Sequence, residues 1–258
     1  MSVSPKNRLR NQILQTSNSL AEGVRISKRL LRNFLANSNN IDSSNFTKFD
    51  ATDLQLMFDL IDNDFFEGLV NAAIESERHT LCFRVANRMT NSGGVTTTRF
   101  SQDGAKSLAF EIAISSTLLF GSFRDQKPIV VTGLLCGDRL QAFKRIMEHE
   151  MIHLIEMLLW RTSSCSATRF QNIARRIFSH KQSTHELITP RDTASSKYAI
   201  ETGDWVGFQI KGQQLFGYVN RITKRATVLV PSSVGTKYSD GKKYRKYYVP
   251  IEKLSKAA

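Results

Sequence analysis

The amino-acid sequence predicts an α+β fold, in which helices and a small mixed sheet precede a small all-β unit. Three observations support this class. Apolar residues recur at helical spacing before residue 66 and again across 143–160, three extended segments lie between these helices, and short period-two segments follow residue 200. With 258 residues, of which 41% are hydrophobic, the chain can bury one sizeable core and a second small one.

The N-terminal residues 1–48 are expected to form a basic extension that is helical or flexible. Between Leu20 and Leu35, apolar residues recur at helical spacing among Arg and Lys, and the polar segment NSNNIDSSN at 37–45 then breaks the pattern. Such a helix can lie on an acidic surface or pack on the next domain. Packing is the favoured interpretation.

The central domain is expected to span residues 50–190. Its first helix has apolar residues at helical spacing from Leu54 to Phe65 and a suitable C-cap at Gly68. Three extended segments follow, and they have the sequences HTLCFRVANR, GVTTTRF and LAFEIAIS. The edge strand of such a sheet can bind a peptide in extended form beside a helix that presents a metal ion.

The segment FKRIMEHEMIHLIEMLLW, residues 143–160, contains the pattern His-Glu-x-x-His. On a helix, His149 and His153 lie one above the other with Cβ atoms roughly 5–6 Å apart, so both imidazoles can bind one ion. Glu150 projects from the neighbouring side, where it can reach a metal-bound water without coordinating the metal. Helices also carry histidines without any metal nearby. Here the surrounding apolar residues predict a buried helix, in which an unpartnered histidine pair is costly, and the pattern therefore predicts a zinc site.

Charge and cysteine content restrict the classes of function. The net charge of +13 suggests a polyanionic partner, with nucleic acid or a nucleoprotein as the first candidate and plain solubility as the other explanation. The three cysteines, Cys82, Cys136 and Cys165, have no Cys-x-x-Cys spacing, which argues against a disulfide framework and for a reducing compartment. No secretion signal, long apolar run or glycine-rich phosphate loop is present. We therefore expect a cytoplasmic protein without a membrane partner and without nucleotide-driven chemistry.

Several segments together resemble SprT-like domains, which are zinc metallopeptidases with a zincin-like fold. The resemblance covers roughly residues 50–190 and rests on DLIDNDFFEG, FRVANRMTNSGG, FEIAISSTLL, HEMIHLIEML and RFQNIARRIF. The family includes the Spartan proteases, which degrade proteins crosslinked to DNA, and bacterial members of uncertain role. The resemblance implies that His149 and His153 bind Zn²⁺ and that Glu150 is the general base.

The third zinc ligand departs from the family pattern. SprT-like domains usually place a His followed by Gly four residues ahead of the aromatic that begins the next helix, whereas residues 166–167 are Ser and Ala here and Phe170 marks the helix. The neighbouring Cys165 is the first substitute because a thiolate binds zinc well, although it can also be an ordinary buried residue. His180 and His185 stay open as ligands. The intervening helix carries them away from the family position unless the chain folds back.

The C-terminal part is expected to be a separate unit. Residues 191–199 have the Thr, Ser and Lys composition of a linker, and residues 200–258 contain five short strands that resemble SH3-like barrels of the KOW or Tudor kind. From residue 199 onward the chain has eleven Lys or Arg and four Asp or Glu, a net charge of +7. About half of the excess positive charge therefore lies in this unit.

Cations alternate with tyrosines in the segment KYSDGKKYRKYYV, residues 237–249. Single-stranded nucleic acid is commonly held by cations on its phosphates and by aromatic rings on its bases. The alternative is that the tyrosines pack the barrel and the lysines are only solvated. The pattern favours a nucleic-acid-binding site. Its predicted residues are Lys242, Lys243, Arg245, Lys246 and Tyr247.

Taken together, these features predict a zinc metallopeptidase that acts on nucleic-acid-associated proteins. The competing hypothesis is a non-catalytic nucleic-acid-binding or ribosome-associated protein, in which zinc only clamps the helix to the loop after it. The presence of Glu150 favours the enzyme, because a structural zinc site has no need of a general base. The irregular third ligand favours the binding protein.

Overall fold

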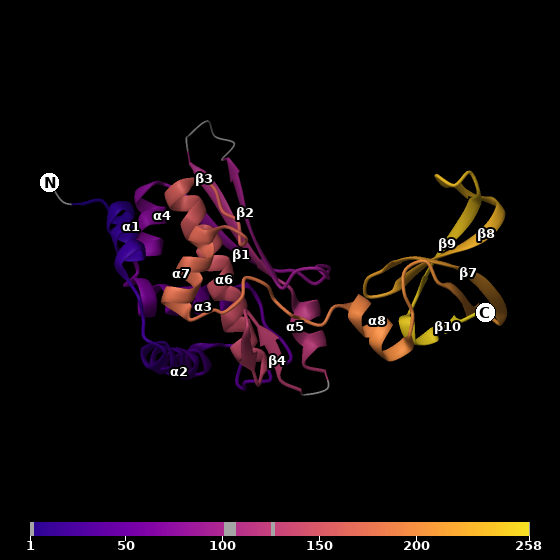
Figure 1. The fold of residues 1–258 in the computed structure, drawn as a ribbon, viewed down its shortest axis with the longest axis horizontal. Helices are drawn as coiled ribbons and strands as arrows, with labels where there is room; N and C mark the ends of the chain where they lie inside the picture. The colour runs from indigo at the N-terminus through magenta and orange to yellow at the C-terminus, as the bar shows by residue number, and fades with distance from the viewer. Residues whose placement is uncertain (1–2, 101–106, 125–126, 258) are drawn as a thin grey trace. The chain divides into compact units, whose positions relative to one another are not determined.

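The computed structural model describes residues 3–100, 107–124 and 127–257, and its mixture of helices and strands confirms the α+β class (Figure 1). The chain divides into two compact units, residues 1–187 and 188–258. The helices of the first unit are α1 (Pro5–Gln15), α2 (Leu20–Asn37), α3 (Ala51–Phe66), α4 (Leu69–Ser76), α5 (Ser116–Ser122), α6 (Arg139–Trp160) and α7 (Thr168–Phe178). Its strands are β1 (Thr80–Val85), β2 (Gly94–Phe100), β3 (Leu108–Ile114), β4 (Ile129–Val131) and β5 (Leu134–Cys136).

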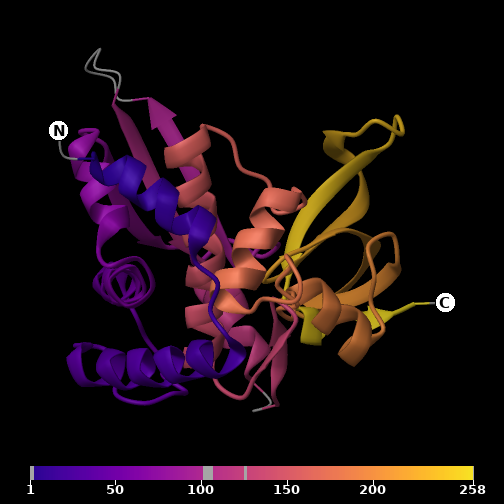
Figure 2. The ribbon, with the colours of Figure 1, turned by 60° about the vertical axis from the view of Figure 1, so that its left-hand side comes forward.

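A three-stranded mixed sheet positions the helix that carries the two histidines. Its strand order is β1-β3-β2, with β1 parallel and β2 antiparallel to the central β3. The three extended segments expected from the sequence are these three strands. Strand β2 lies at the edge of the sheet and packs against α6 (Figures 1 and 2).

The N-terminal helices belong to the core of the first unit, so the helix expected between Leu20 and Leu35 packs on the central domain, as the favoured interpretation has it. Their apolar faces are buried together with those of α3 and α6. The buried residues on α1 and α2 are Leu9, Ile13, Ile26, Leu30 and Phe34. In addition, Arg176 of α7 donates hydrogen bonds to the backbone oxygens of Ile13 and Thr16, at 2.8 and 2.7 Å. The first unit thus begins with α1.

Helix α3 ends at Phe66, two residues before the predicted cap. Glu67 and Gly68 both have left-handed backbone conformations, with φ of 56° and 74°, and α4 starts directly after them. The Asp62 carboxylate accepts hydrogen bonds from the backbone nitrogens of Val70 and Asn71, at 3.0 and 2.9 Å. The turn therefore joins two helices and does not lead directly into the sheet.

The second unit is an antiparallel sheet with one helix packed on it. Its elements are α8 (Pro190–Tyr198), β6 (Trp205–Ile210), β7 (Gln213–Ile222), β8 (Ala226–Lys237), β9 (Lys243–Val249), the 3₁₀-helix η1 (Ile251–Lys253) and β10 (Ser255–Lys256). The strand order is β10-β6-β7-β8-β9. In the described part of the chain, the two end strands β10 and β9 do not pair with each other. The sheet is therefore open and does not form a closed barrel.

Residues 190–198 form the helix α8, where composition predicted a linker. Thr189 and Asp192 form a capping box, in which the Thr189 hydroxyl accepts from the Asp192 nitrogen and the Asp192 carboxylate accepts from the Thr189 nitrogen. Pro190 occupies the first turn, where a missing N–H costs nothing. The side chain of Ala194 is buried in the second core. The local capping signal thus outweighs the polar composition.

Across the described residues, no helix combines the length and the apolar character that crossing a membrane requires.

Candidate metal centre

Helix α6 brings the two histidines and Glu150 into the interior of the first unit. Asp138 caps its N-terminus by accepting a hydrogen bond from the Gln141 nitrogen at 2.8 Å. The helix is buried on nearly all sides, and the exposed fractions of His149 and Glu150 are only 5% and 2%. The expected buried helix is therefore present.

The Nε2 atoms of His149 and His153 face each other at 3.1 Å. Two nitrogens bound to one tetrahedral zinc at about 2.05 Å would be roughly 3.3 Å apart. Burial lowers the pKa of both imidazoles, so both are neutral near pH 7, the form that binds a metal. The histidine pair is therefore prearranged for a shared ion.

A chain of hydrogen bonds fixes the orientation of the His153 ring. The Ser163 hydroxyl donates to Oε2 of Glu156 at 2.6 Å and lies 2.7 Å from Nδ1 of His153. Because the single hydroxyl hydrogen is used on the carboxylate, the Nδ1 of His153 must carry the other hydrogen, which leaves the lone pair on Nε2. Arg169 closes the chain by donating to Oε1 of Glu156 at 2.6 Å and lies over the Trp160 ring at 4.6 Å.

The other histidine has a different environment. The Nδ1 of His149 is buried and makes no hydrogen bond to any described residue. The ring of Phe170 packs on both imidazoles, with centroid distances of 4.8 Å to His149 and 4.6 Å to His153. Since His153 presents a lone pair, His149 donates through Nε2 in the 3.1 Å contact. A bound cation would take the place of that hydrogen.

Glu150 is held from the sheet by Thr96 of β2. The Thr96 hydroxyl lies 2.8 Å from Oε2 of Glu150 and 3.0 Å from its backbone oxygen. A Cβ atom at Gly94 would come within 2.6 Å of Oε1 of Glu150, so only glycine leaves room for the carboxylate. Burial raises the pKa of Glu150 to about 8, against the effect of the Thr96 hydrogen bonds. A cation close to the carboxylate would lower this pKa again.

Among the residues that the structure describes, two groups of side chains could hold a metal ion, and both contain His149. The first is His149, His153 and Cys165, and the second is His149, Glu150 and His185; within each group the donor atoms lie within 4.8 Å of one another. The structure thus brings the predicted ligand Cys165 to the histidine pair. It also brings in His185, which the sequence had left open.

His185 reaches the site because the chain folds back after α7. It forms an antiparallel bridge with Val131 of β4, and the Thr132 nitrogen donates to the Thr184 oxygen at 3.1 Å. The rings of His149 and His185 lie 4.3 Å apart between centroids. The buried Nε2 of His185 has no hydrogen-bond partner among the described residues, and burial lowers the pKa of this imidazole to about 3. An unsatisfied neutral nitrogen of this kind suits a metal ion.

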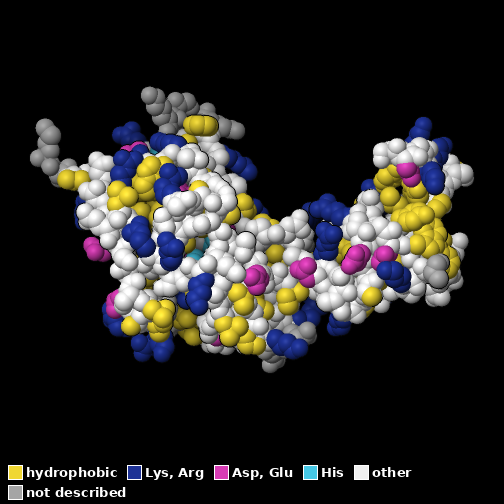
Figure 3. Space-filling model, in the orientation of Figure 1, with side chains coloured by type: hydrophobic (Ala, Val, Ile, Leu, Met, Phe, Trp, Pro, Cys, Tyr) yellow, Lys and Arg dark blue, Asp and Glu magenta, His cyan; other side chains and the backbone are white. Residues whose placement is uncertain are grey.

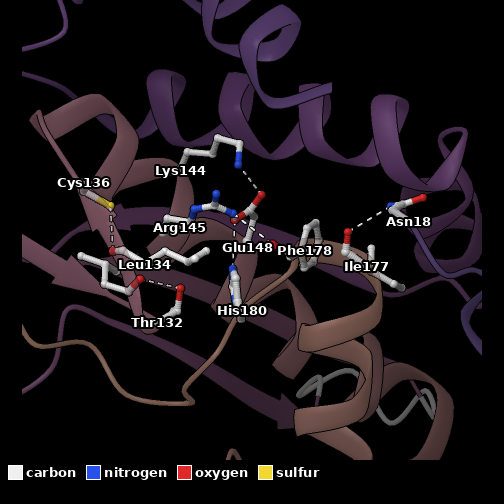
Figure 4. A network of polar contacts seen from close by, with 11 residues as sticks. Asn18, Thr132, Leu134, Cys136, Lys144, Arg145, Glu148, Ile177, Phe178 and His180 are labelled. Atoms are coloured by element: carbon white, nitrogen blue, oxygen red, sulfur yellow. Dashed lines mark hydrogen bonds and ion pairs between the residues drawn. The ribbon is translucent and has the colours of Figure 1, made fainter. Parts of the chain in front are cut away.

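His180, the other histidine left open, belongs to a buried ionic cluster around Glu148 of α6. Figure 4 shows Lys144, Arg145 and His180 directed at the Glu148 carboxylate, with distances of 2.5, 3.0 and 3.0 Å. The neighbouring cations hold the pKa of Glu148 well below its usual range against the opposing effect of burial, and burial lowers the pKa of Lys144 to about 8. Arg145 also donates to the Phe178 oxygen at 3.1 Å. The cluster anchors the start of the folded-back segment.

The predicted nucleic-acid-binding residues lie on and beside β9, and they differ in exposure. Lys242, Lys243, Arg245 and Lys246 are exposed. Tyr247 packs against the second core, with its ring 5.6 Å from that of Phe208 between centroids. Tyr247 is therefore partly buried on the core side of β9, and its contact with nucleic acid stays a prediction. The alternation of β9 turns Tyr248, which is 63% exposed, to the other face of the sheet.

Comparisons with protein-family models, with curated proteins and with solved structures found no match for this chain.

Proposed function

We propose that the protein is a zinc-dependent metallopeptidase of SprT-like type that acts on nucleic-acid-associated proteins. One observation carries this proposal. The Nε2 atoms of His149 and His153 lie 3.1 Å apart inside the protein, and Glu150, whose Oε2 lies 2.8 Å from the Thr96 hydroxyl, has a carboxylate oxygen within 4.8 Å of a ring nitrogen of His149. This arrangement provides two metal ligands and one separate proton acceptor, which are the parts that metal-assisted peptide hydrolysis needs.

When bound, zinc would polarise the scissile carbonyl of the substrate and lower the pKa of a water molecule bound to the metal. Glu150 would act as the general base that takes a proton from the attacking water and gives it to the leaving amine. Thr96 keeps the carboxylate at a fixed position, and the buried surroundings strengthen its electrostatic interactions. The free edge of β2, which carries Thr96, offers backbone hydrogen bonds for a substrate peptide in extended form.

The two ligand groups correspond to two different functions. Binding by His149, His153 and Cys165 leaves Glu150 free as a general base, as a hydrolytic site requires. Binding by His149, Glu150 and His185 uses Glu150 as a ligand, so no base remains. The second group supports the alternative, a nucleic-acid-binding or ribosome-associated protein with a structural zinc site. We favour the first group because the Ser163 hydroxyl already directs the His153 lone pair toward His149.

We propose in addition that the second unit is an SH3-like barrel of a partly open kind, and its strand order supports this. Four strands follow one another as a meander, and the short fifth strand returns beside the first. In a strongly twisted sheet this order brings the two end strands toward each other, as in a partly open barrel.

Metal content and cleavage together test the proposed enzyme. We expect one zinc per chain in the purified protein, lost in His149→Ala and His153→Ala. Glu150→Gln should retain the zinc and lose cleavage of unfolded or DNA-bound protein substrates, because an amide cannot accept the proton. Glu75→Gln, a change at an exposed position of α4, is the matched control. Equal cleavage by wild type and Glu150→Gln would remove Glu150 from the mechanism.

Cobalt substitution separates the two ligand groups. A thiolate ligand gives cobalt a charge-transfer absorption in the near ultraviolet, so the favoured group predicts this band in wild type and its loss in Cys165→Ser. Under the same hypothesis, His185→Asn should leave the band unchanged. A cobalt protein that lacks the band and loses its metal only in His185→Asn would instead support the structural site.

A further inference from the structure

The register of the second sheet assigns its paired residues to one face or the other. Directly paired residues point to the same face, and successive residues alternate. One face contains the apolar side chains of the second core. The opposite face, here called the outer face, contains Trp205 and Gly207 of β6, Phe216, Tyr218 and Arg221 of β7, Thr227 and Leu229 of β8, and Lys246 and Tyr248 of β9. None of these outer residues belongs to the second core.

Aromatic side chains are concentrated on the outer face and remain accessible. Phe216 and Tyr218 are each 44% exposed, and Tyr248 is 63% exposed. A Cβ atom at Gly207 would come within 2.9 Å of the Phe216 ring, so that ring lies across the glycine of the neighbouring strand. Trp205 supports Tyr218 with an edge contact at 4.5 Å between centroids. The rings are thus held by the sheet while part of their surface faces solvent.

Positive charge lies in the same cross-strand rows as these rings. The Tyr218 row continues through Leu229 to Lys246, and the Tyr248 row continues through Thr227 to Arg221. The strands β6 to β10 contain no Asp or Glu at all. In Figure 3, hydrophobic and tyrosine side chains are exposed over the strands of the second unit, with Lys and Arg side chains beside them. The face is therefore complementary to a flexible polyanion that also offers flat apolar groups.

We infer that the outer face binds single-stranded nucleic acid, with bases stacked on Phe216, Tyr218 and Tyr248 and phosphates on Arg221 and Lys246. A single strand fits better than a duplex, because exposed rings need unstacked bases. An acidic peptide would satisfy the cations but leave the rings without planar groups to stack on. The inference deepens the partner named in the proposed function, yet it uses neither zinc nor Glu150.

Fluorescence anisotropy with a labelled oligothymidylate of about twelve nucleotides, within the range of single-strand modules, tests this inference on the full chain. Tyr218→Ala and Tyr248→Ala should each weaken binding by roughly fivefold to a hundredfold, as loss of one stacked base does. Tyr248→Phe should bind like wild type, because it keeps the ring. Lys246→Gln should flatten the log-log dependence of affinity on salt by about 0.7, the slope per phosphate contact on a single strand.

Matched controls lie on the first unit. Phe100→Ala removes an aromatic side chain that is 82% exposed, and Lys28→Gln removes one exposed charge from α2. Neither should change affinity as much as its counterpart on the outer face. Melting curves of each variant show whether a loss of affinity comes from unfolding. Tyr248→Leu keeps apolar volume but has no aromatic ring, and it should still lose affinity for the oligonucleotide.

Three results would overturn the inference. They are absence of binding by wild type at low salt, unchanged affinity in both Tyr218→Ala and Tyr248→Ala, and equal competition by a duplex of the same length. Zinc-free protein and Glu150→Gln should bind the oligonucleotide like wild type. A failed peptidase experiment with intact binding, or the reverse, therefore identifies which proposal is wrong.

Discussion

The Ser163 hydroxyl determines which nitrogen of His153 faces the candidate metal. It accepts from Nδ1 and donates to Glu156, so Nε2 keeps its lone pair. Removing the hydroxyl frees the imidazole to change tautomer and orientation. Partners of this kind typically contribute 10- to 100-fold to metal affinity, and we expect a loss of about that size in Ser163→Ala, measured by competition with a chelating dye. Ser164→Ala, at an exposed serine, is the control, and equal affinity in both variants would refute the role of Ser163.

The glycine at position 94 makes room for the general base. The Glu150 side chain occupies the space that a Cβ atom at position 94 would need. Its Oε1 and Cγ atoms lie within 2.6 and 2.7 Å of that Cβ position. Gly94→Ala should push the carboxylate aside and reduce peptide cleavage by about 100-fold, as a displacement of about 1 Å can do, while zinc content stays unchanged. Gly121→Ala, where a Cβ meets nothing within 4 Å, should cleave like wild type. Full activity of Gly94→Ala would show that Glu150 is not the base.

Among individual residues, the sequence predicts those whose role follows from a short spacing along one helix. His149, Glu150 and His153 follow from one pattern on one helix. Thr96 and Ser163 could not be predicted, because their role depends on contacts between segments far apart in the chain or across a loop. Strand alternation places Tyr247 on the same face as the buried Val249, so its partial burial could have been predicted from the sequence.

The capping box that starts α8 stabilises an element for which the sequence composition predicted only a linker. Losing such a cap costs about 1 kcal/mol, and Thr189→Ala should therefore destabilise this helix by about that amount. Hydrogen exchange of the α8 amides should become correspondingly faster. The exposed Thr202 offers a control, and Thr202→Ala should leave α8 exchange unchanged. If both variants exchange like wild type, the cap contributes nothing to α8.

Element positions were more predictable than their assembly. Periodicity located α2, α3, α6 and the three strands of the first sheet, because each has its own hydrophobic pattern. The return of the chain along β4 depends on one bridge at His185 and on the ionic cluster around Glu148. Neither the bridge nor the ionic cluster produces a periodic pattern of residues in the sequence. The same holds for the open edge of the second sheet, which depends on twist and strand length.

For the whole molecule, buried neutral histidines make metal-free stability depend on pH. Burial lowers the pKa of His79, whose Nδ1 accepts a hydrogen bond from the Leu108 nitrogen at 3.1 Å. In the unfolded chain this group protonates as the pH falls through about 6.5, whereas the folded state resists protonation. The free energy of unfolding should therefore decrease below that pH, as measured by urea titration.

The variant His79→Asn isolates this contribution. Asparagine can accept the Leu108 hydrogen bond through its side-chain oxygen but does not titrate. We expect a smaller decrease in unfolding free energy between about pH 7.5 and pH 5.5 than in wild type. An identical decrease in both proteins would assign the pH dependence to other groups.

Cys165 and His185 lie on either side of α7, and each is near His149. A metal held through Cys165 would close a chain loop of sixteen residues, and one held through His185 a loop of thirty-six. Loop-closure entropy grows so slowly that the longer loop costs only about 0.7 kcal/mol more. Chain length therefore hardly discriminates between the two donors. The preference of the metal for thiolate or imidazole therefore decides whether Cys165, before α7, or His185, after it, binds the ion. Helix α7 does not have to refold when one donor replaces the other.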